Sequence, residues 1–447
     1  MYINRSHIVQ LIYVLLIIIP LSFKFELYPN IIVYPQELLL PFLILAYLFL
    51  NRGKIKYNGY LQPYYFQLAA LAVIVLATII SFFSYFEIEG LLKLFKYILY
   101  IISVIIVAEA KFITFLKAFN RIAFITIVLG LIIFVFNKFN TGLSWATYMH
   151  EATWKAELMP SGFSNLIYSF PLNEFTRYSG NHGIFGSYLV LVYLINICMI
   201  FSKKQLASKF NILIVVLALI NISLLTSRET LLVFLVSNFL AILIYFTIGR
   251  FKLSYFLGLM VLAFVCSTIF IFLWNADINI VLINKLKYTI ESFQETNQEA
   301  NISTRFAVWQ LTLLSFLQSP LQILTGYGFN RSNYVEALQS ANIYYGKNLD
   351  FVGIPESYFF TMLSYGGLFA LFLGSMFFLV MIKQLIRKDL FSSIFGRVFL
   401  CYIIGLFITN NTGASVLADL LLVQLGLTYL WIVKNEKRNR QDSFNHS

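Results

Sequence analysis

Long uncharged apolar segments recur along the chain, and they constrain its fold more than any other feature. A membrane-spanning helix needs about 20 mostly apolar residues. With 60% hydrophobic and 12% charged residues, the chain also lacks the polar surface that soluble domains of this length require. The sequence therefore predicts an all-α, polytopic membrane protein. Segments free of Asp, Glu, Lys and Arg include residues 57–86, 178–202, 230–249, 253–276 and 357–382.

Charged residues and turn residues divide the chain into about twelve predicted spanning helices. Strands of an outer-membrane barrel are excluded, because these segments are apolar on every side and do not alternate. An even number of helices puts both termini on one side of the membrane. The predicted helices lie near residues 8–23, 32–50, 64–86, 91–108, 121–137, 183–201, 211–227, 230–248, 254–274, 356–382, 394–410 and 414–433.

The distribution of Lys and Arg predicts the orientation of these helices. If the N-terminus is cytoplasmic, the inner segments hold 20 of the 32 basic residues, whereas the short outer turns hold almost none. Both termini are therefore predicted to be cytoplasmic. The net charge of +12 is spread over many short loops, so it indicates topology and no nucleic-acid partner.

Two predicted outer segments are long enough to carry function. They are the loop near residues 138–181 and the large loop 275–355. In the large loop, apolar residues at helical spacing end at Ser319-Pro320, which predicts a short helix at the outer membrane face. The predicted organisation is residues 1–274 with helices one to nine, residues 275–355 as the large outer loop, residues 356–433 with helices ten to twelve, and a basic cytoplasmic tail over 434–447.

Ionisable residues at membrane depth gather toward the outer half of the predicted bundle. Such groups are costly in lipid, so each is expected to face a wet cavity or a partner. A transporter is expected to place them near the membrane midplane. Their outer position instead predicts a cavity open to the outer leaflet. They are Glu37, Lys93, Lys96, Arg177, Arg228, Glu229, Glu356 and Asp419.

Arginine beside glycine or aromatic residues is the recurring pattern of the outer segments. A guanidinium group binds phosphate oxygens through paired donors, and aromatic rings offer flat faces to sugar C–H surfaces. The combination suits a lipid that carries a sugar phosphate. The motifs are Arg177-Tyr178-Ser179-Gly180, Ser227-Arg228, Arg305 with Trp309, and residues 326–331, which read Gly-Tyr-Gly-Phe-Asn-Arg.

Each of these residues also has an ordinary structural explanation. An arginine at the membrane surface often binds a lipid headgroup, and Trp309 fits an interfacial aromatic belt. Gly326 and Gly328 are also what a simple turn requires. Neither a metal ion nor a cofactor is expected. The only histidines of the outer segments are His150 and His182, and these segments contain no Asp-x-Asp pair.

Taken in chain order, the motifs resemble the superfamily of O-antigen polymerases and O-antigen ligases. The similarity in layout spans nearly the whole chain, including the helices and the large outer loop. It also includes Pro320 after the amphipathic segment and Gly366-Gly367 inside predicted helix ten. The resemblance implies a GT-C-type membrane glycosyltransferase that uses glycans linked to undecaprenyl diphosphate. It places the protein in the bacterial cytoplasmic (inner) membrane, with the reaction at its outer face.

One departure from the family pattern favours the polymerase, Wzy-type, branch. The ligase branch typically carries a His followed by Asn or a similar residue where the large outer loop enters helix ten. Here residues 355–358 read Pro-Glu-Ser-Tyr, and no His occurs between His182 and His446.

The expected site residues follow from the charge that develops on the departing lipid diphosphate. Arg228 is expected to stabilise that charge and Glu356 to accept the proton of the attacking sugar hydroxyl, so these two are the predicted catalytic residues. The predicted substrate-binding residues are Arg177, Arg305 and Arg331 for the diphosphate, with Tyr358 positioning sugar.

The expected partners are a lipid-diphosphate-linked glycan donor, an acceptor of the same kind and the bilayer. A Wzz-type chain-length regulator and a Wzx-type flippase are further partners of such a polymerase. Two other functions remain open at this point: a ligase that transfers polysaccharide to lipid A core, and a flippase for lipid-linked oligosaccharides. A scaffold without catalysis explains the outer arginines poorly.

Overall fold

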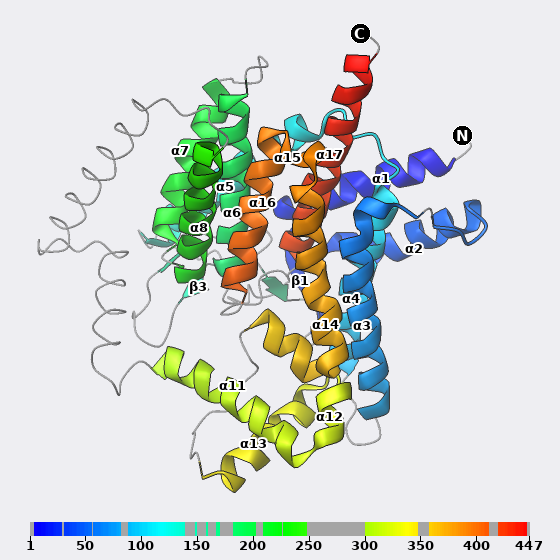
Figure 1. Ribbon diagram of the computed structural model, residues 1–447, viewed down its shortest axis with the longest axis vertical. Coiled ribbons are helices and arrows are strands. Elements are labelled where there is room, and N and C mark those ends of the chain that lie inside the picture. The colour runs from blue at the N-terminus through cyan, green and yellow to red at the C-terminus, as the bar shows by residue number, and fades with distance from the viewer. Residues whose placement is uncertain are drawn as a thin grey trace, which may run out of the picture.

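The computed structural model shows a bundle of long helices with a smaller helical unit at one end (Figure 1). Predicted helix nine and both ends of the large outer loop lie outside the residues that it describes. The described residues are 4–28, 31–55, 57–81, 88–138, 148–149, 158–159, 167–169, 182–202, 209–225, 227–247, 300–346, 357–410 and 419–444.

The bundle confirms the predicted fold class of a polytopic helical membrane protein. Each described long helix of the bundle overlaps one of the predicted spans. These helices are α1 (Arg5–Ile17), α2 (Pro35–Leu50), α3 (Gln62–Ser81), α4 (Ile88–Val107), α5 (Phe115–Lys138), α6 (His182–Phe201), α7 (Lys209–Leu224), α8 (Arg228–Thr247), α14 (Tyr358–Ile386), α16 (Ile394–Thr409) and α17 (Asp419–Phe444).

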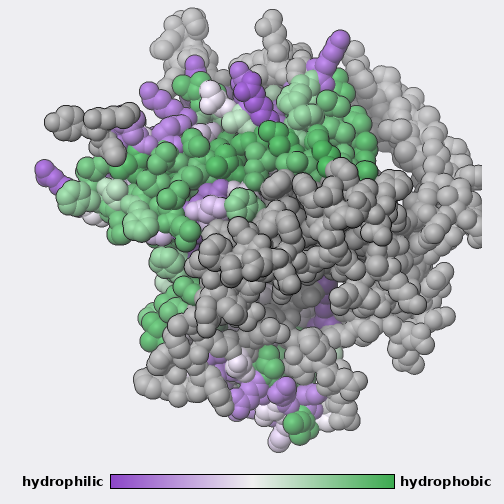
Figure 2. Space-filling model, turned by 180° about the vertical axis from the view of Figure 1, so that it is seen from behind, coloured by the Kyte–Doolittle hydropathy of each residue, from purple (hydrophilic) through white to green (hydrophobic). Residues whose placement is uncertain are grey.

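Length and hydropathy together divide the helices of the bundle. Among the described residues, five helices are long and apolar enough to cross a membrane, within α3, α4, α5, α6 and α14. Other helices are equally apolar but shorter, and α7 and α16 have 16 residues each. Figure 2 shows a broad band of hydrophobic side chains across one face, with hydrophilic side chains along its upper edge and again at its lower end. This pattern is what a membrane-embedded bundle requires.

A helical unit from the large loop lies at the end of the bundle away from the chain termini (Figure 1). We call it the outer unit; it consists of α11 (Ala300–Gln318), α12 (Pro320–Thr325) and α13 (Arg331–Tyr344). The helix predicted before Ser319-Pro320 is confirmed as α11. Pro320 then begins α12, where its missing N–H costs nothing.

Short connecting elements complete the fold and leave its class unchanged. Strand β1 (Lys24–Tyr28) pairs antiparallel with β2 (Ile31–Val33) and parallel with β5 (Ile167–Ser169). The remaining elements are the strand pair β3 (Tyr148–Met149) and β4 (Leu158–Met159), the turns of 3-10 helix η1 (Ile19–Leu21) and η2 (Gly59–Leu61), and α15 (Lys388–Phe391).

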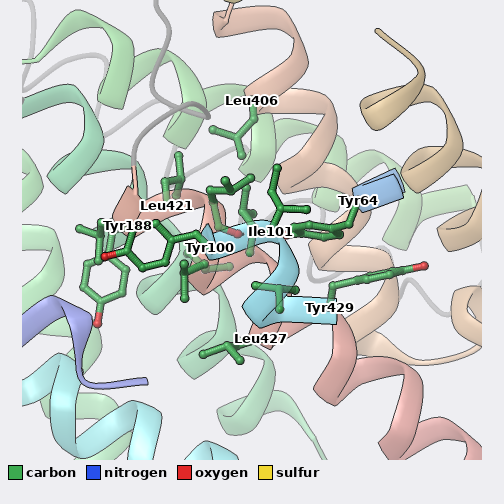
Figure 3. Packing of buried hydrophobic residues seen from close by; sticks show 14 of the residues in the cluster. Tyr64, Tyr100, Ile101, Tyr188, Leu406, Leu421, Leu427 and Tyr429 are labelled. Carbon is green, nitrogen blue, oxygen red and sulfur yellow. Dashed lines mark hydrogen bonds between the residues drawn. The ribbon is translucent and has the colours of Figure 1, made fainter. Parts of the chain in front are cut away.

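Buried tyrosines join the helices at the centre of the bundle (Figure 3). The hydroxyl of Tyr64 on α3 donates to the carbonyl oxygen of Leu422 on α17 at 3.0 Å. Asn196 donates to Asn120, and Asn120 donates to Asn211, which connects α6, α5 and α7. Such bonds satisfy polar groups that water cannot reach, so they fix how the helices pack.

Lys434, in the C-terminal half of α17, makes stability depend on pH. Its ammonium group donates to the carbonyl oxygen of Ala110 at 2.5 Å and lies over the ring of Phe112. The pKa of Lys434 is lowered from 10.5 to about 8, mainly by burial; Glu109 opposes this shift and Lys437 contributes to it. The charged form is therefore disfavoured in the fold. This cost is fully present below pH 8 and declines as the pH rises toward 10.5.

We expect Lys434→Met to raise the temperature of thermal unfolding in detergent at pH 7. The difference between the variant and the native protein should shrink between pH 8 and pH 10, where the native lysine loses its proton in the fold. A difference that stays constant over this range would contradict the assignment.

Candidate functional site

Helices α6 and α8 begin beside each other at the outer-unit end of the bundle. A Cβ atom at Gly186 would lie 1.8 Å from Oγ1 of Thr230, so only glycine permits this approach of the two helices. The hydroxyl of Tyr402 on α16 donates to the carbonyl oxygen of Ser187 at 2.7 Å. The first turns of α6 and α8 are thus held together, with α16 against them.

Helix α14 begins at the C-terminal end of the same helix α16. The backbone N–H of Tyr358 donates to the carbonyl oxygen of Asn410 at 2.9 Å, and the hydroxyl of Ser357 donates to the same oxygen at 3.4 Å. The rings of Phe359 and Phe407 pack edge to face at 5.4 Å. The starts of α6, α8 and α14 are therefore distributed around the C-terminal half of α16 (Figure 1).

This arrangement favours an anion at the outer-unit end of the bundle. The first N–H groups of a helix lack partners within it, and the helix dipole places partial positive charge there. Ser227 caps α8 by accepting from the N–H of Thr230 at 3.3 Å, and Ser357 caps α14 through Phe360 at 3.5 Å. The caps already use some of these N–H groups, so what favours an anion is the summed dipole of three helix starts, which the C-terminal end of α16 between them partly opposes.

Two of the predicted arginines begin helices, and two predicted site residues lie outside the described residues. Arg228 is the first residue of α8, and Arg331 is the first residue of α13. Arg228 therefore starts one of the helices just described. Arg177 and Glu356 lie outside the described residues, so the predicted shared site of Arg177 with Arg228 stays a prediction.

Arg305 lies on α11, which packs against the start of α14. One turn further along α11, the indole of Trp309 stacks on the ring of Phe360, with centroids 5.1 Å apart and planes within 6°. Phe306 packs edge to face against Trp309 at 5.0 Å. Because residues four apart lie on one face of a helix, the half-buried Arg305 shares the face that meets α14.

Tyr358 is buried in the interior of the bundle. Its hydroxyl lies 2.6 Å from Oε1 of Gln67 and 3.0 Å from the carbonyl oxygen of Gly374, and these two acceptors share its proton. The bonds connect the first turn of α14 to α3 and to a later turn of α14. They describe a residue that fixes helix packing, and its role in positioning sugar remains a prediction.

A kink in α14 receives the loop between α12 and α13. Gly367 has a φ of 64° and interrupts the helix. The carbonyl oxygens before it then accept from the loop: Tyr327 N–H donates to Ser364 at 2.8 Å, and Gly328 N–H donates to Tyr365 at 3.1 Å. Backbone thus meets backbone where the loop contacts the kink. The predicted turn at residues 326–328 therefore docks the outer unit on α14.

The same loop contacts α3, which fixes the outer unit on two helices. The N–H of Phe329 donates to Oγ1 of Thr78 at 2.7 Å, and the side-chain amide of Asn333 donates to the carbonyl oxygen of Ser81 at 3.4 Å. Gly328 has a φ of 73°, and a Cβ atom there would lie 2.7 Å from Cα of Thr78. No substitution with a side chain fits at this contact without backbone movement.

Glu37 forms a buried ion pair that the sequence did not predict. Its side chain is 3% exposed, and Nζ of Lys96 lies 3.2 Å from its Oε1. Tyr100 donates to the same oxygen at 2.8 Å, and the N–H of Tyr34 donates to Oε2 at 3.0 Å. A carboxylate with this set of partners is satisfied inside the bundle, so Glu37 connects α2 to α4 and does not extend to the interface.

Metal ligands do not gather among the described residues. No group of three or more His, Cys, Asp or Glu side chains in this part of the chain could hold a metal ion. Independence from metal remains a prediction.

The comparison with protein families points to the same region as the geometry. Residues 213–375 match the model of the O-antigen ligase family. The matched segment runs from α7 through α8 and the outer unit to the kink of α14, so it contains Arg228, Arg305 and the docking loop. No curated protein matches the chain.

Proposed function

Because the chain carries an O-antigen ligase family domain, in agreement with its resemblance to the O-antigen polymerase and ligase superfamily, we propose that it is a polysaccharide polymerase of the GT-C type. It would join undecaprenyl-diphosphate-linked repeat units into O-antigen or a related surface polysaccharide. The reaction would occur at the outer face of the bacterial cytoplasmic membrane, with both termini in the cytoplasm. Donor and acceptor are then both lipid-linked glycans, supplied by a flippase and limited in length by a chain-length regulator.

The observation that carries this proposal is the meeting of three helix starts at the outer-unit end. As the glycosidic C–O bond breaks, negative charge develops on the diphosphate that leaves with the lipid. Preorganised N–H groups and guanidinium groups aimed at that charge stabilise the transition state more than the bound substrate. Arg228 at the start of α8 and Arg305 beside the start of α14 supply the positive charge, with Arg177 and Arg331 as further diphosphate ligands.

A proton must also leave the attacking sugar hydroxyl. We assign this proton to Glu356, which directly precedes the cap residue Ser357 of α14 in the sequence. In the proposed step, the acceptor hydroxyl attacks the anomeric carbon, the bond to the diphosphate oxygen breaks, and Glu356 takes the hydroxyl proton.

We prefer a polymerase to a ligase because of the sequence just before α14. The absence of a His between His182 and His446 separates this chain from the ligase pattern. Transfer of a finished chain to lipid A core is the second candidate, favoured by the description of the matched family. A lipid-linked oligosaccharide flippase is the third and would need no covalent step.

Purified full-length protein supplied with one lipid-diphosphate-linked repeat unit distinguishes these functions. A polymerase yields a ladder of longer lipid-linked products. A ligase yields no ladder without lipid A core, and a flippase yields only relocated substrate. Absence of a ladder with active flippase transport in vesicles would overturn the proposal.

Arg228→Lys tests the proposed diphosphate clamp while keeping the positive charge. Lysine lacks the planar fork that holds two phosphate oxygens, so a bond that strengthens in the transition state is lost. Loss of one charge-assisted bond corresponds to a rate about 10- to 100-fold lower. The measurement is the rate of ladder formation at matched expression. Arg305→Lys is also expected to lower this rate.

The matched control is Arg121→Lys, an exposed arginine in the first turns of α5 near the chain termini. It makes the same chemical change far from the proposed chemistry. Equal rates for Arg228→Lys and Arg121→Lys would remove Arg228 from the site.

A further inference from the structure

A large cavity lies on the face that carries both chain termini, at the opposite end from the proposed reaction. Its volume is about 1030 Å³. It is bounded by the start of α1, the turn after α4, the segment 57–62, the last turns of α14 and the inner end of α17. None of the residues assigned to glycosyl transfer lines it, so the proposed function leaves this cavity without a role.

The charged lining of the cavity is mainly positive. Four basic residues, Arg5, Lys383, Arg387 and Lys437, face one carboxylate, Glu109. Glu109 is already paired with Arg5. Within the described part of the chain, Lys383 and Arg387 form no ion pair with a carboxylate, and both are exposed. The cavity therefore presents uncompensated positive charge.

Hydrogen bonds hold the wall of the cavity in place. The side-chain amide of Gln384 donates to the carbonyl oxygen of Gly59 at 2.9 Å, and Tyr429 donates to Gln384. The ammonium group of Lys437 lies 4.4 Å from the ring centre of Tyr60, and the hydroxyl of Tyr60 donates to Asp389, outside the lining, at 3.4 Å. A site whose wall is ordered before binding loses less entropy when a ligand enters.

We propose that this cavity binds a phosphate-bearing anion, and that its source is the headgroup of an anionic membrane lipid. Arginine binds phosphate through paired donors, and lysine contributes a point charge. Lys383 lies in the last turn of α14 and Arg387 is the residue that caps its C-terminal end, so both line the same side of the cavity. The volume exceeds that of a phosphate ion and accommodates the glycerol portion of a headgroup.

The position of the cavity supports a lipid as the source. The outer surface of α14 beside it exposes apolar side chains, with Leu379 45% and Ile386 56% exposed. A lipid held by its headgroup would lay its acyl chains along this surface. Positive charge is general on the cytoplasmic face of membrane proteins. Here, however, the basic groups converge on one structured cavity, which is the arrangement that recognises anionic headgroups.

The test is native mass spectrometry of the purified full-length protein with three probes. They are phosphatidylglycerol, phosphatidylcholine of the same acyl chains, and inorganic pyrophosphate. We expect phosphatidylglycerol to bind more tightly than phosphatidylcholine. The double variant Lys383→Gln with Arg387→Gln should bind phosphatidylglycerol about 10- to 30-fold more weakly. Both side chains are exposed, so the fold should tolerate the change.

The control is Lys117→Gln with Arg121→Gln, a pair with the same spacing and charge, exposed on α5 outside the cavity. This variant should bind phosphatidylglycerol as the native protein does, and Arg387→Lys should keep most of the binding. A second outcome is that the native protein binds pyrophosphate, the cavity variant does not, and the protein shows no preference among lipids. This outcome would support the phosphate site but would identify a soluble anion as its ligand. Equal losses in the two double variants, or no binding of either anionic probe, would overturn the proposal.

Discussion

Gly326→Val is expected to detach the outer unit from α14 and to abolish formation of the polysaccharide ladder. A Cβ atom at this position would lie 2.4 Å from the backbone nitrogen of Gly366, and backbone cannot rotate away as a side chain can. Its φ of 70° adds the strain of a β-branched residue in the left-handed region. Together these effects should cost more than about 4 kcal/mol. Limited proteolysis between α11 and α14 would report the detachment directly.

Gly346→Val separates strain from collision in this experiment. Gly346 follows α13 with a φ of 59°, but a Cβ atom there meets nothing within 4 Å. The control therefore also places a β-branched residue at a positive φ in the same part of the chain, but without the clash. It should remain resistant to protease and keep most of its activity. If the two variants were cleaved alike, the docking contact would have no special role.

Glu37→Gln is expected to lower the stability of the bundle by about 3–5 kcal/mol, because it removes the buried carboxylate that pairs with the half-buried ammonium group of Lys96. Glutamine retains the size of the side chain but only one of its two acceptor oxygens, whereas Tyr34 and Tyr100 donate to different oxygens. The loss therefore combines the missing charge with one missing hydrogen bond. Thermal unfolding of the purified protein in detergent would measure it. Lys96 itself is 18% exposed, which leaves little water to replace the carboxylate.

The double variant Glu37→Gln with Lys96→Met provides the control. It removes both charges and should recover most of the stability that Glu37→Gln loses, since replacing a buried pair as a whole is often close to neutral. If the stability losses of Glu37→Gln alone and Lys96→Met alone summed to the loss of the double variant, the two side chains would not interact.

The sequence predicted the elements that depend on local pattern. A spanning helix is specified by its own apolar residues, so α3, α4 and α6 lie where charge interruptions indicated. Helix α11 followed from the spacing of its apolar residues and from the proline after it. The start of α14 at Tyr358 was also close to its predicted position.

Contacts between distant residues could not be predicted in the same way. The turn at residues 326–328 was visible, but nothing local shows that Tyr327 donates to Ser364 across the kink. Glu37 and Lys96 were both placed toward the outer half, yet their pairing depends on how α2 packs on α4. The gathering of the starts of α6, α8 and α14 around α16 is a property of the assembled bundle.

The shortness of α7 affects the bilayer beside the proposed site. Its 16 described residues rise about 24 Å, less than the ~30 Å of a typical hydrocarbon core. Ile212 and Val216 of α7 are exposed apolar side chains, and so are Leu235 and Phe239 of α8, the next helix in the chain. This hydrophobic mismatch favours a locally thinned membrane. Thinning would draw the headgroup plane toward the bundle and bring the diphosphate of a lipid-linked glycan nearer to the start of α8.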